Sequence, residues 1–429
     1  MIKGIVNESQ PLISCEECGL VVAIPDVVGG QKACCPRCGH QLTSVVNQPY
    51  QRPVAYAIAC LLALMLSVSF PFMSFSIGEL SQEITLLQVA GMLKYFENAS
   101  LALLLLGTVI VLPTIYVSAI LYLHIKAGKY QNHVLTSQQN TRVKLLCRII
   151  FAVEPWLMVD VFLIGVLVSL IKIASLADIN MGSSFWAFCV YTVLVVKCIS
   201  MVDKRWLWDQ FIPIRQIEGV KAGDTHHSRN HLSCHVCHQI NPMSARNHSY
   251  CIRCNSQLNN YVPHKNIQHS WALLIASATF YIPANLCPIM YTVSLGESEG
   301  STIIEGVLLL WSMGSYPIAA IIFFASVFIP IAKMFTLGWL YYNVRKMPEL
   351  PLEESMLRLK VYRVAEFIGR WSMIDIFVIA ILVALVQLNN LMEIYPGPAA
   401  LYFAAVVILT MFSAVSFDPR LLWNSRENK

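Results

Sequence analysis

Eight cysteines form two groups whose spacing suits metal binding. Each group contains two CxxC pairs: Cys15, Cys18, Cys35 and Cys38, then Cys234, Cys237, Cys251 and Cys254. The pairs are separated by 16 residues in the first group and by 13 in the second. Two thiolates from each CxxC turn supply half of a tetrahedral shell, so this spacing predicts two zinc sites.

Structural zinc is the favoured reading, and two other thiol chemistries stay open. A module of about 25 residues cannot build a sufficient core, so a metal would supply its folding free energy. Redox chemistry at CxxC would need a thioredoxin-like βαβ pattern, which the sequence lacks, and an iron–sulfur site is the third reading. Four thiolates close the zinc shell and leave no open position for catalysis, so we do not expect an enzyme.

A histidine cluster surrounds the second cysteine group and could add a ligand. It comprises His226, His227, His231, His235 and His238. A solvated polar linker is the simpler interpretation of these residues.

The elements that position these modules are membrane helices. The chain has 429 residues, of which 56% are hydrophobic and 13% charged, against about 25% charged in soluble domains. Eight apolar runs approach the length of a membrane-spanning helix. They cover residues 54–73, 100–125, 153–174, 185–202, 271–292, 316–342, 366–387 and 398–416.

The distribution of Lys and Arg predicts the orientation. Basic residues gather in the loops after the second and sixth runs and in the central segment, on the side of the N-terminus. The positive-inside rule then places both termini and both cysteine modules in the cytoplasm. Shorter apolar stretches at 83–96 and 302–314 would lie on the outer side, as interfacial helices or as packed loops.

The chain repeats one plan, with an offset of about 217 residues that becomes 215 near the ends. Pro71, Met73 and Pro113 correspond to Pro288, Met290 and Pro330, and Trp156 to Trp371. The predicted fold is an all-α polytopic membrane protein with two parallel four-helix repeats, each preceded by a zinc-ribbon-like module. The predicted domains are 1–50 and 211–265 for the modules, and 51–210 and 266–429 for the membrane blocks.

Polar residues inside the second membrane block form a second candidate site. Helical spacing and similar depth should bring together Ser326, Lys333, Ser372, Asp375 and Thr410. Ionisable groups within membrane spans are costly and suggest function, and a Lys–Asp pair would reduce the cost. The competing interpretation is that Lys333 snorkels to the interface while Asp375 ties helices together.

The repeat provides an internal comparison for this cluster. The first-copy counterparts are Val109, Tyr116, Leu157, Asp160 and Val195, so only the aspartate is kept. A network needed only to hold four helices together should occur in both copies. Its restriction to the second copy favours a transport or substrate site.

Four short strings give the chain a resemblance to a known family. They are Tyr281–Leu286 (YIPANL), Gly369–Asp375 (GRWSMID), Gly182–Phe185 (GSSF) and Arg205–Asp209 (RWLWD). With the paired CxxC modules, they resemble the paraquat-inducible protein A family of Gram-negative inner-membrane proteins. GSSF and RWLWD fit the paraquat-inducible branch better than the YebS-type branch.

The resemblance implies a role in lipid movement between membranes. Family members work beside a periplasmic tunnel protein with MCE domains, so the expected partners are that protein, phospholipid and the membrane, and no nucleic acid. The implied result is envelope integrity and stress resistance. Two alternatives remain open: a cytoplasmic-thiol redox or stress sensor, and a scaffold that anchors the periplasmic partner.

Overall fold

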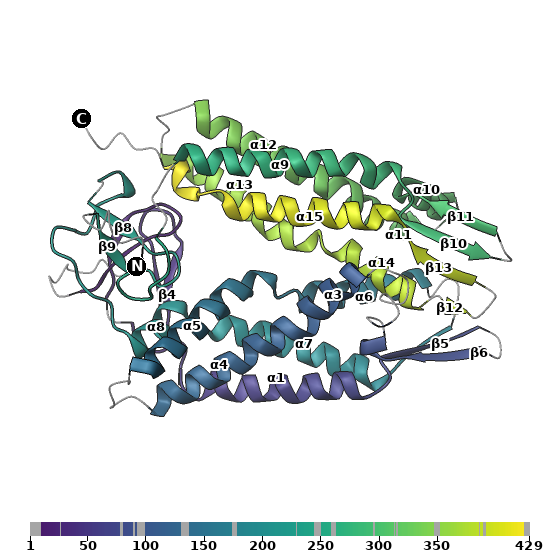
Figure 1. Cartoon of the computed structure of the whole chain (residues 1–429), viewed down its shortest axis with the longest axis horizontal. Helices are drawn as coiled ribbons and strands as arrows, with labels where there is room; N and C mark the ends of the chain where they lie inside the picture. Colours follow the sequence, from purple (N-terminus) through teal and green to yellow (C-terminus); the bar gives the residue numbers. More distant parts are fainter. Residues whose placement is uncertain are drawn as a thin grey trace.

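The computed structural model describes most of the chain. The described residues are 10–25, 27–77, 80–88, 91, 99–129, 137–173, 178–228, 230–243, 250–258, 263–294, 297–312, 314, 316–346, 352–385, 387–388 and 392–423. Two helical blocks lie side by side, with the cysteine modules at one end and small β-sheets at the other (Figure 1).

The first half contains a module of two short hairpins and then a membrane block. The hairpins are β1 (Leu12–Ser14) with β2 (Val21–Ala23), and β3 (Lys32–Cys34) with β4 (Gln41–Ser44). The block consists of α1 (Arg52–Ser69), β5 (Met73–Ile77), β6 (Leu80–Ile84), α3 (Ala99–Leu106), η1 (Gly107–Val111), α4 (Leu112–Lys129), α5 (Ser137–Val153), η2 (Glu154–Trp156), α6 (Val159–Ile173), β7 (Asp178–Met181), α7 (Ser183–Met201) and α8 (Lys204–Phe211).

The second half repeats this order. Its module contains η3 (His226–Ser228), β8 (His231–Ser233) and β9 (Ile240–Pro242). Its block consists of α9 (Pro263–Leu286), β10 (Met290–Ser294), β11 (Glu297–Ser301), α10 (Ile303–Ser312), α11 (Tyr316–Phe323), η5 (Phe324–Phe328), α12 (Ile329–Lys346), α13 (Leu352–Trp371), α14 (Ile374–Leu385), β12 (Gln387–Leu388), β13 (Met392–Pro396), α15 (Pro398–Ser416) and η6 (Pro419–Leu422). The packing repeats as well, since α1 lies along α7 and α9 along α15.

Six helical segments in the described part of the chain are long and apolar enough to cross a membrane. They are Arg52–Ser69, Ala102–Lys129, Thr141–Leu170, Ser183–Met201, Phe324–Val344 and Pro398–Ser416. Helix α9 and the α13–α14 pair stand at the fifth and seventh predicted spans. The expected count of eight is therefore not confirmed.

The prediction of an all-α chain is wrong at one end of each block. Strand β5 pairs with β6 and β7 in a three-stranded sheet, and β10 pairs with β11 and β13 in a four-stranded sheet that β12 completes. Residues 73–77 (MSFSI) do alternate apolar and polar types. The run is only five residues long and follows a helix directly, so the apolar run 54–73 masked it.

Each sheet is joined to the helix after it at a glycine. Any other residue at this position would force the neighbouring backbone to move. An ideal Cβ on Gly182 would lie 2.0 Å from the carbonyl oxygen of Pro71, and one on Gly397 would lie 2.1 Å from that of Pro288. The amides of these glycines donate to Phe72 and Ile289. Backbone therefore packs on backbone at the same place in both repeats.

Two further predictions need correction or completion. The basic loop after the second run contains α5, whose buried residues Val143, Cys147 and Ile150 recur at helical spacing. In the second copy the short apolar stretch at 302–314 forms α10. Half of its first-copy counterpart, 83–96, lies outside the described residues, namely 89–90 and 92–96.

A proline in the second helix of each block accompanies a local change of helix type. Pro113 and Pro330 each lie two residues after the end of a five-residue π-helical segment, η1 or η5, and the two segments are 217 residues apart. Proline has no backbone N–H to donate, so one hydrogen bond of the helix is missing. A π-helical turn changes the hydrogen-bond pattern of the backbone next to this position. Pro71 and Pro288 instead lie between a helix end and a strand.

The two blocks contact one another mainly through α6 and α14. The rings of Phe162 and Phe377 have centroids 5.5 Å apart, and Gly165 makes room for Phe377, whose Cβ would lie 3.0 Å from an added Cβ. Nearer the modules, Trp156 packs on Phe412 with centroids 5.3 Å apart.

Candidate functional site

The predicted cysteines form two buried four-thiol groups. In each group the four sulfurs lie within 4.8 Å of one another. Cys15 pairs with Cys38 and Cys18 with Cys35, each with sulfurs 3.5 Å apart; Cys234 to Cys254 and Cys237 to Cys251 measure 3.6 and 3.5 Å. Zn–S bonds of about 2.3 Å in a tetrahedron place sulfurs about 3.8 Å apart. The donor set and its size therefore fit a four-thiolate metal ion.

Four matching turns aim these sulfurs inward. In every CxxC pair, the amide of the residue after the second cysteine donates to the carbonyl of the first. That residue has a positive φ: 68° at Gly19, 70° at Gly39, and 57° at both His238 and Asn255. Glycine and asparagine tolerate this region well, so the sequence chooses the turn at three of the four places.

Nearby charges tune the first module. The ring of His40 lies 3.1 Å from Glu17. Burial alone raises the pKa of the Glu17 carboxyl, but hydrogen bonds from His40 and Arg363 outweigh it and lower that pKa to about 2. Burial alone lowers the pKa of His40, and its hydrogen bond to Glu17 reverses this and raises that pKa.

Within the described residues the metal-ligating groups contain cysteines only. His238 occupies the positive-φ position of its CxxC turn, and its ring nitrogen lies 3.4 Å from the carboxylate of Glu16. His235 lies 3.3 Å from the guanidinium of Arg420, and burial lowers the pKa of its ring. These two histidines thus contact the neighbouring module and block rather than completing a metal shell.

The two four-cysteine groups contact the membrane blocks crosswise. Arg363, on α13 of the second block, donates to the carbonyl of Cys38 in the first module. Arg148, on α5 of the first block, donates to the carbonyl of Cys254 in the second module. Arg148 and Arg363 are 215 residues apart, and each contacts the fourth cysteine of the other repeat's module.

A second pair of contacts obeys the same crossed rule. The guanidinium of Arg37 lies 4.8 Å from the ring centre of Trp423, and that of Arg253 lies 5.9 Å from Trp208. The buried core shows it too, because the first four cysteines cluster with residues of the second block and the last four with residues of the first. Arg37 and Arg253 each directly precede the last cysteine of their module. Both CxRC turns therefore carry an arginine that contacts the block of the other repeat.

In the second membrane block, the structure joins two residues of the predicted polar cluster. The ammonium of Lys333 donates to the hydroxyl of Thr410 at 3.0 Å, and that hydroxyl donates to Val407 at 2.9 Å. Lys333 is only 4% exposed, so it does not snorkel to the surface of the chain. An ideal Cβ on Gly369 would lie 2.9 Å from the ammonium nitrogen, so this glycine makes room for it.

The remaining cluster residues have separate places. Ser326 is buried within the π-helix η5, which runs into α12, and it lies seven residues before Lys333. Ser372 is buried at the break between α13 and α14 and donates weakly to Ile368 at 3.5 Å. Asp375 lies in α14, but its side chain is outside the described residues.

Three site residues escaped sequence reasoning. Arg148 and Arg363 were counted only among the basic residues that set orientation, although their conserved offset marks them as a repeat-related pair. Gly369 lies in the GRWSMID string, but only the structure shows that Lys333 needs its missing side chain.

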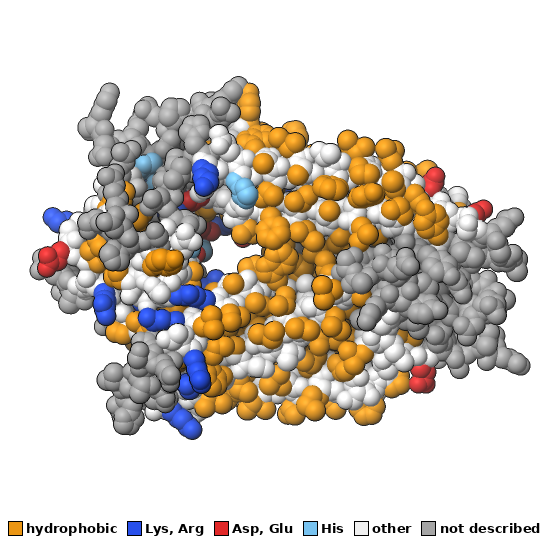
Figure 2. Space-filling view, viewed as in Figure 1, with side chains coloured by type: hydrophobic (Ala, Val, Ile, Leu, Met, Phe, Trp, Pro, Cys, Tyr) orange, Lys and Arg blue, Asp and Glu red, His pale blue; other side chains and the backbone are white. Residues whose placement is uncertain are grey.

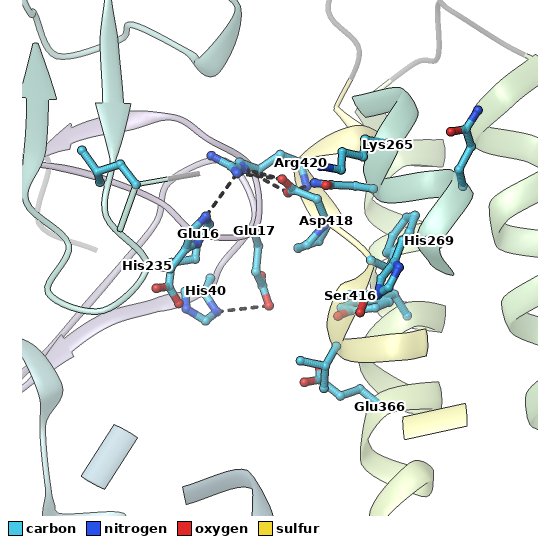
Figure 3. Close-up of a pocket in the computed structure, with 17 residues that line it drawn as sticks. Glu16, Glu17, His40, His235, Lys265, His269, Glu366, Ser416, Asp418 and Arg420 are labelled. Carbon is cyan, nitrogen blue, oxygen red and sulfur yellow. Dashed lines mark hydrogen bonds and ion pairs between the residues drawn. The ribbon is translucent and has the colours of Figure 1, made fainter. Parts of the chain in front are cut away.

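A cavity of about 1160 Å³ lies between the modules and the second block (Figure 3). Both modules, the first turns of α9, α13 and the end of α15 contribute to its wall. The lining residues are Glu16, Glu17, His40, His235, Leu258, Lys265, Asn266, Gln268, His269, Tyr362, Glu366, Val415, Ser416, Phe417, Asp418, Pro419 and Arg420. The space-filling view shows the molecule hollowed between the module end and the helices (Figure 2).

Comparison with known proteins places these features in a family. A family model described as "Paraquat-inducible protein A" matches the chain twice, over residues 50–212 and 267–427. The "Intermembrane transport protein PqiA" of Escherichia coli (strain K12) is 43% identical over 414 residues, covering 96% of this chain and 95% of that protein.

More distant relatives match over the same length. The "Lipophilic envelope-spanning tunnel protein A" of Escherichia coli (strain K12) is 28% identical, covering 96% of this chain and 91% of that protein. A "Probable intermembrane transport protein" of Haemophilus influenzae is 27% identical, covering 96% and 95%. No solved structure matches the chain significantly.

Proposed function

The chain belongs to the paraquat-inducible protein A family, and we propose that it is an inner-membrane subunit of an intermembrane lipid transport system. The observation that carries this proposal is the nearly end-to-end similarity to a relative named for intermembrane transport. In this role the chain accepts or delivers phospholipid beside a periplasmic MCE-type tunnel protein and supports envelope integrity under stress. It works as a transporter subunit and not as an enzyme.

The distribution of charge supports an orientation with the modules and both termini in the cytoplasm. Lys and Arg side chains gather near the module end, whereas the charged side chains visible among the described residues at the opposite end are acidic (Figure 2). The positive-inside rule favours this arrangement. The small sheets then face the periplasm, where a tunnel partner would dock.

Two structural zinc ions complete the modules in this proposal. Eight buried thiols in two four-sulfur groups support it, and a closed four-thiolate shell has no position for a substrate. Zinc would thus fold the modules that brace the two blocks.

Lys333 is the residue that we propose for the transport step. Its buried ammonium meets a hydroxyl in the second block, and its first-copy counterpart is Tyr116. A buried cation suits either a phospholipid phosphate or proton relay with Asp375. Ser326, Ser372 and Thr410 would complete this polar centre.

Rescue of cells that lack the protein tests the proposal. Wild-type chain should restore lipid exchange between the two membranes and survival under envelope stress. Lys333→Ala and Asp375→Asn should insert normally but fail in both assays, while Lys197→Ala, at an exposed lysine of α7, should rescue. Full rescue by Lys333→Ala contradicts this site, and normal tunnel-partner binding without lipid exchange by wild type favours a scaffold.

A further inference from the structure

The cavity beneath the modules combines groups of both charge signs from separate elements. Figure 3 shows Glu16, Glu17, His40 and His235 on the module side, and Lys265, His269 and Glu366 on the side of the helices. Several of these groups already have partners: Glu17 binds His40, and Asp418 binds Arg420 at 2.7 Å. These pairs fix the walls of the cavity.

Lys265 and His269 form its basic side. They are four residues apart on α9, so they lie one above the other on one helical face. Both side chains are exposed and line the cavity. A lysine and a histidine so placed can donate hydrogen bonds to two oxygens of one phosphate.

Acidic groups also line the cavity. Glu366, on α13, lies on the same side as Lys265 and His269, whereas Glu16 lies across from them in the first module, 3.4 Å from His238. A ligand that carried only negative charge would meet these carboxylates as well. The arrangement therefore suits a group with a phosphate at one end and an ammonium at the other.

The repeat shows that this set is specific to the second half. The first-copy counterparts of Lys265, His269 and Glu366 are Gln48, Arg52 and Phe151. A set of charges needed only to hold a module above a block would be expected in both halves. The cavity wall also contains Leu258, Val415 and Phe417, which supply an apolar border next to the polar groups.

We propose that this cavity binds the phosphoethanolamine headgroup of a phospholipid, with phosphate at Lys265 and His269 and ammonium at Glu366 and Glu16. This assignment rests on the proposed function, because a lipid transporter brings such headgroups to the ends of its helices. The cavity would hold the lipid on the cytoplasmic side, separate from the Lys333–Thr410 centre within the block. A soluble phosphoethanolamine ester or inorganic phosphate has related chemistry, and the experiment separates these sources.

Photo-crosslinking of the full chain tests the site locally. A photo-reactive amino acid replaces Gln268, an exposed residue of the cavity wall, in vesicles of equal phosphatidylethanolamine and phosphatidylglycerol. Phosphatidylethanolamine should dominate the adducts identified by mass. Lys265→Ala with His269→Ala should lower the yield about tenfold, through lost charge-assisted hydrogen bonds. Glu366→Gln should reduce the preference for phosphatidylethanolamine.

Matched controls keep the result interpretable. Arg52→Ala removes the exposed first-copy counterpart of His269 and should leave the yield unchanged, and all variants should keep the wild-type metal content. Excess glycerophosphoethanolamine should compete, and inorganic phosphate should not. Equal adducts with both lipids, an unaffected double variant, or displacement by inorganic phosphate would each overturn the proposal.

The same assay separates this site from the transport role. Lys333→Ala should retain the adduct even when lipid exchange is lost. If wild-type chain forms the expected adduct but shows no lipid exchange, the headgroup site stands and the transport proposal fails. If lipid exchange is normal and the adduct pattern is absent, the headgroup site fails alone.

Discussion

Lys333 shows how one polar contact in a membrane block depends on a missing side chain. Its ammonium reaches Thr410 at 3.0 Å, and Gly369 leaves the space that the ammonium occupies. Burial of a charge is costly unless hydrogen bonds compensate. A glycine beside a buried lysine is therefore part of the same site.

Gly369→Ala should impair function more than folding. The new Cβ would lie 2.9 Å from the ammonium nitrogen, which is the far end of a flexible side chain. The lysine can swing away, so we expect a stability loss of about 1 kcal/mol but a loss of lipid exchange comparable to that of Lys333→Ala. Gly338→Ala on α12, where the nearest side-chain atom is 3.6 Å away, is the matched control. Equal lipid exchange by both variants would contradict the proposed role of the gap.

His40 should give the first module a pH-dependent stability. Because pairing with Glu17 raises the folded-state pKa of His40 above its ordinary 6.5, its contribution is full below about pH 6.5 and declines as pH rises through the folded pKa. His40→Gln should therefore destabilise the chain more at pH 6 than at pH 9, by less than about 1 kcal/mol because solvent screens the pair. Thermal unfolding at the two pH values measures this. In a Glu17→Gln background the His40→Gln effect should no longer change with pH.

At the scale of elements, the strands and their glycine junctions occur at the same place in both repeats. An added Cβ would lie 2.0 Å from a backbone carbonyl oxygen at Gly182 and 2.1 Å from one at Gly397. The sheets β5–β6–β7 and β10–β11–β13 are held to α7 and α15 by these junctions. The sheet end of each block is thus joined closely to the helix that follows it.

Gly182→Ala or Gly397→Ala should prevent the sheet and the helix from meeting. Because backbone cannot yield as a side-chain tip does, we expect a cost of about 3 kcal/mol or more and poor accumulation in the membrane. Gly306→Ala in α10 is the control, since nothing lies within 4 Å of its added Cβ and alanine favours a helix. Thermal melting of the purified variants compares them. A wild-type melting temperature for Gly397→Ala would show that this junction adjusts freely.

Sequence reasoning reached the two four-cysteine groups through the CxxC spacing, and it grouped Lys333 with Thr410 because the two lie at similar depth in their helices. It missed the strands, since 73–77 alternate over only five residues beside a long apolar run. It missed α5 because the basic residues of that helix resembled a loop. The crossed docking of Arg148 and Arg363 could not be predicted, because spacing within one repeat carries no information on which block a module contacts.

For the whole molecule, the crossed contacts make the modules a brace between the blocks. Each metal group packs on the block of the other repeat through Arg363 or Arg148, and the blocks also meet through α6 and α14. The halves are therefore joined in two places, by the polar contacts of the modules and by the apolar packing of α6 on α14. Loss of metal should release the contacts of the modules and leave the α6–α14 packing intact.

Metal removal should open the module end selectively. After chelation, we expect amide hydrogen exchange to increase in the modules, in α13 near Arg363 and in α5 near Arg148, because the CxxC turns that these arginines grip lose their fold. Helices α6 and α14 should keep their protection, since Phe162 and Phe377 hold them together without metal.

Arg363→Gln alone should speed metal release from the first module roughly tenfold, because partners of ligating groups tune metal affinity, and should leave the second module unchanged. Arg148→Gln should give the reverse pattern. Equal release from both modules in either variant would mean that the crossed arginines do not control their separate sites.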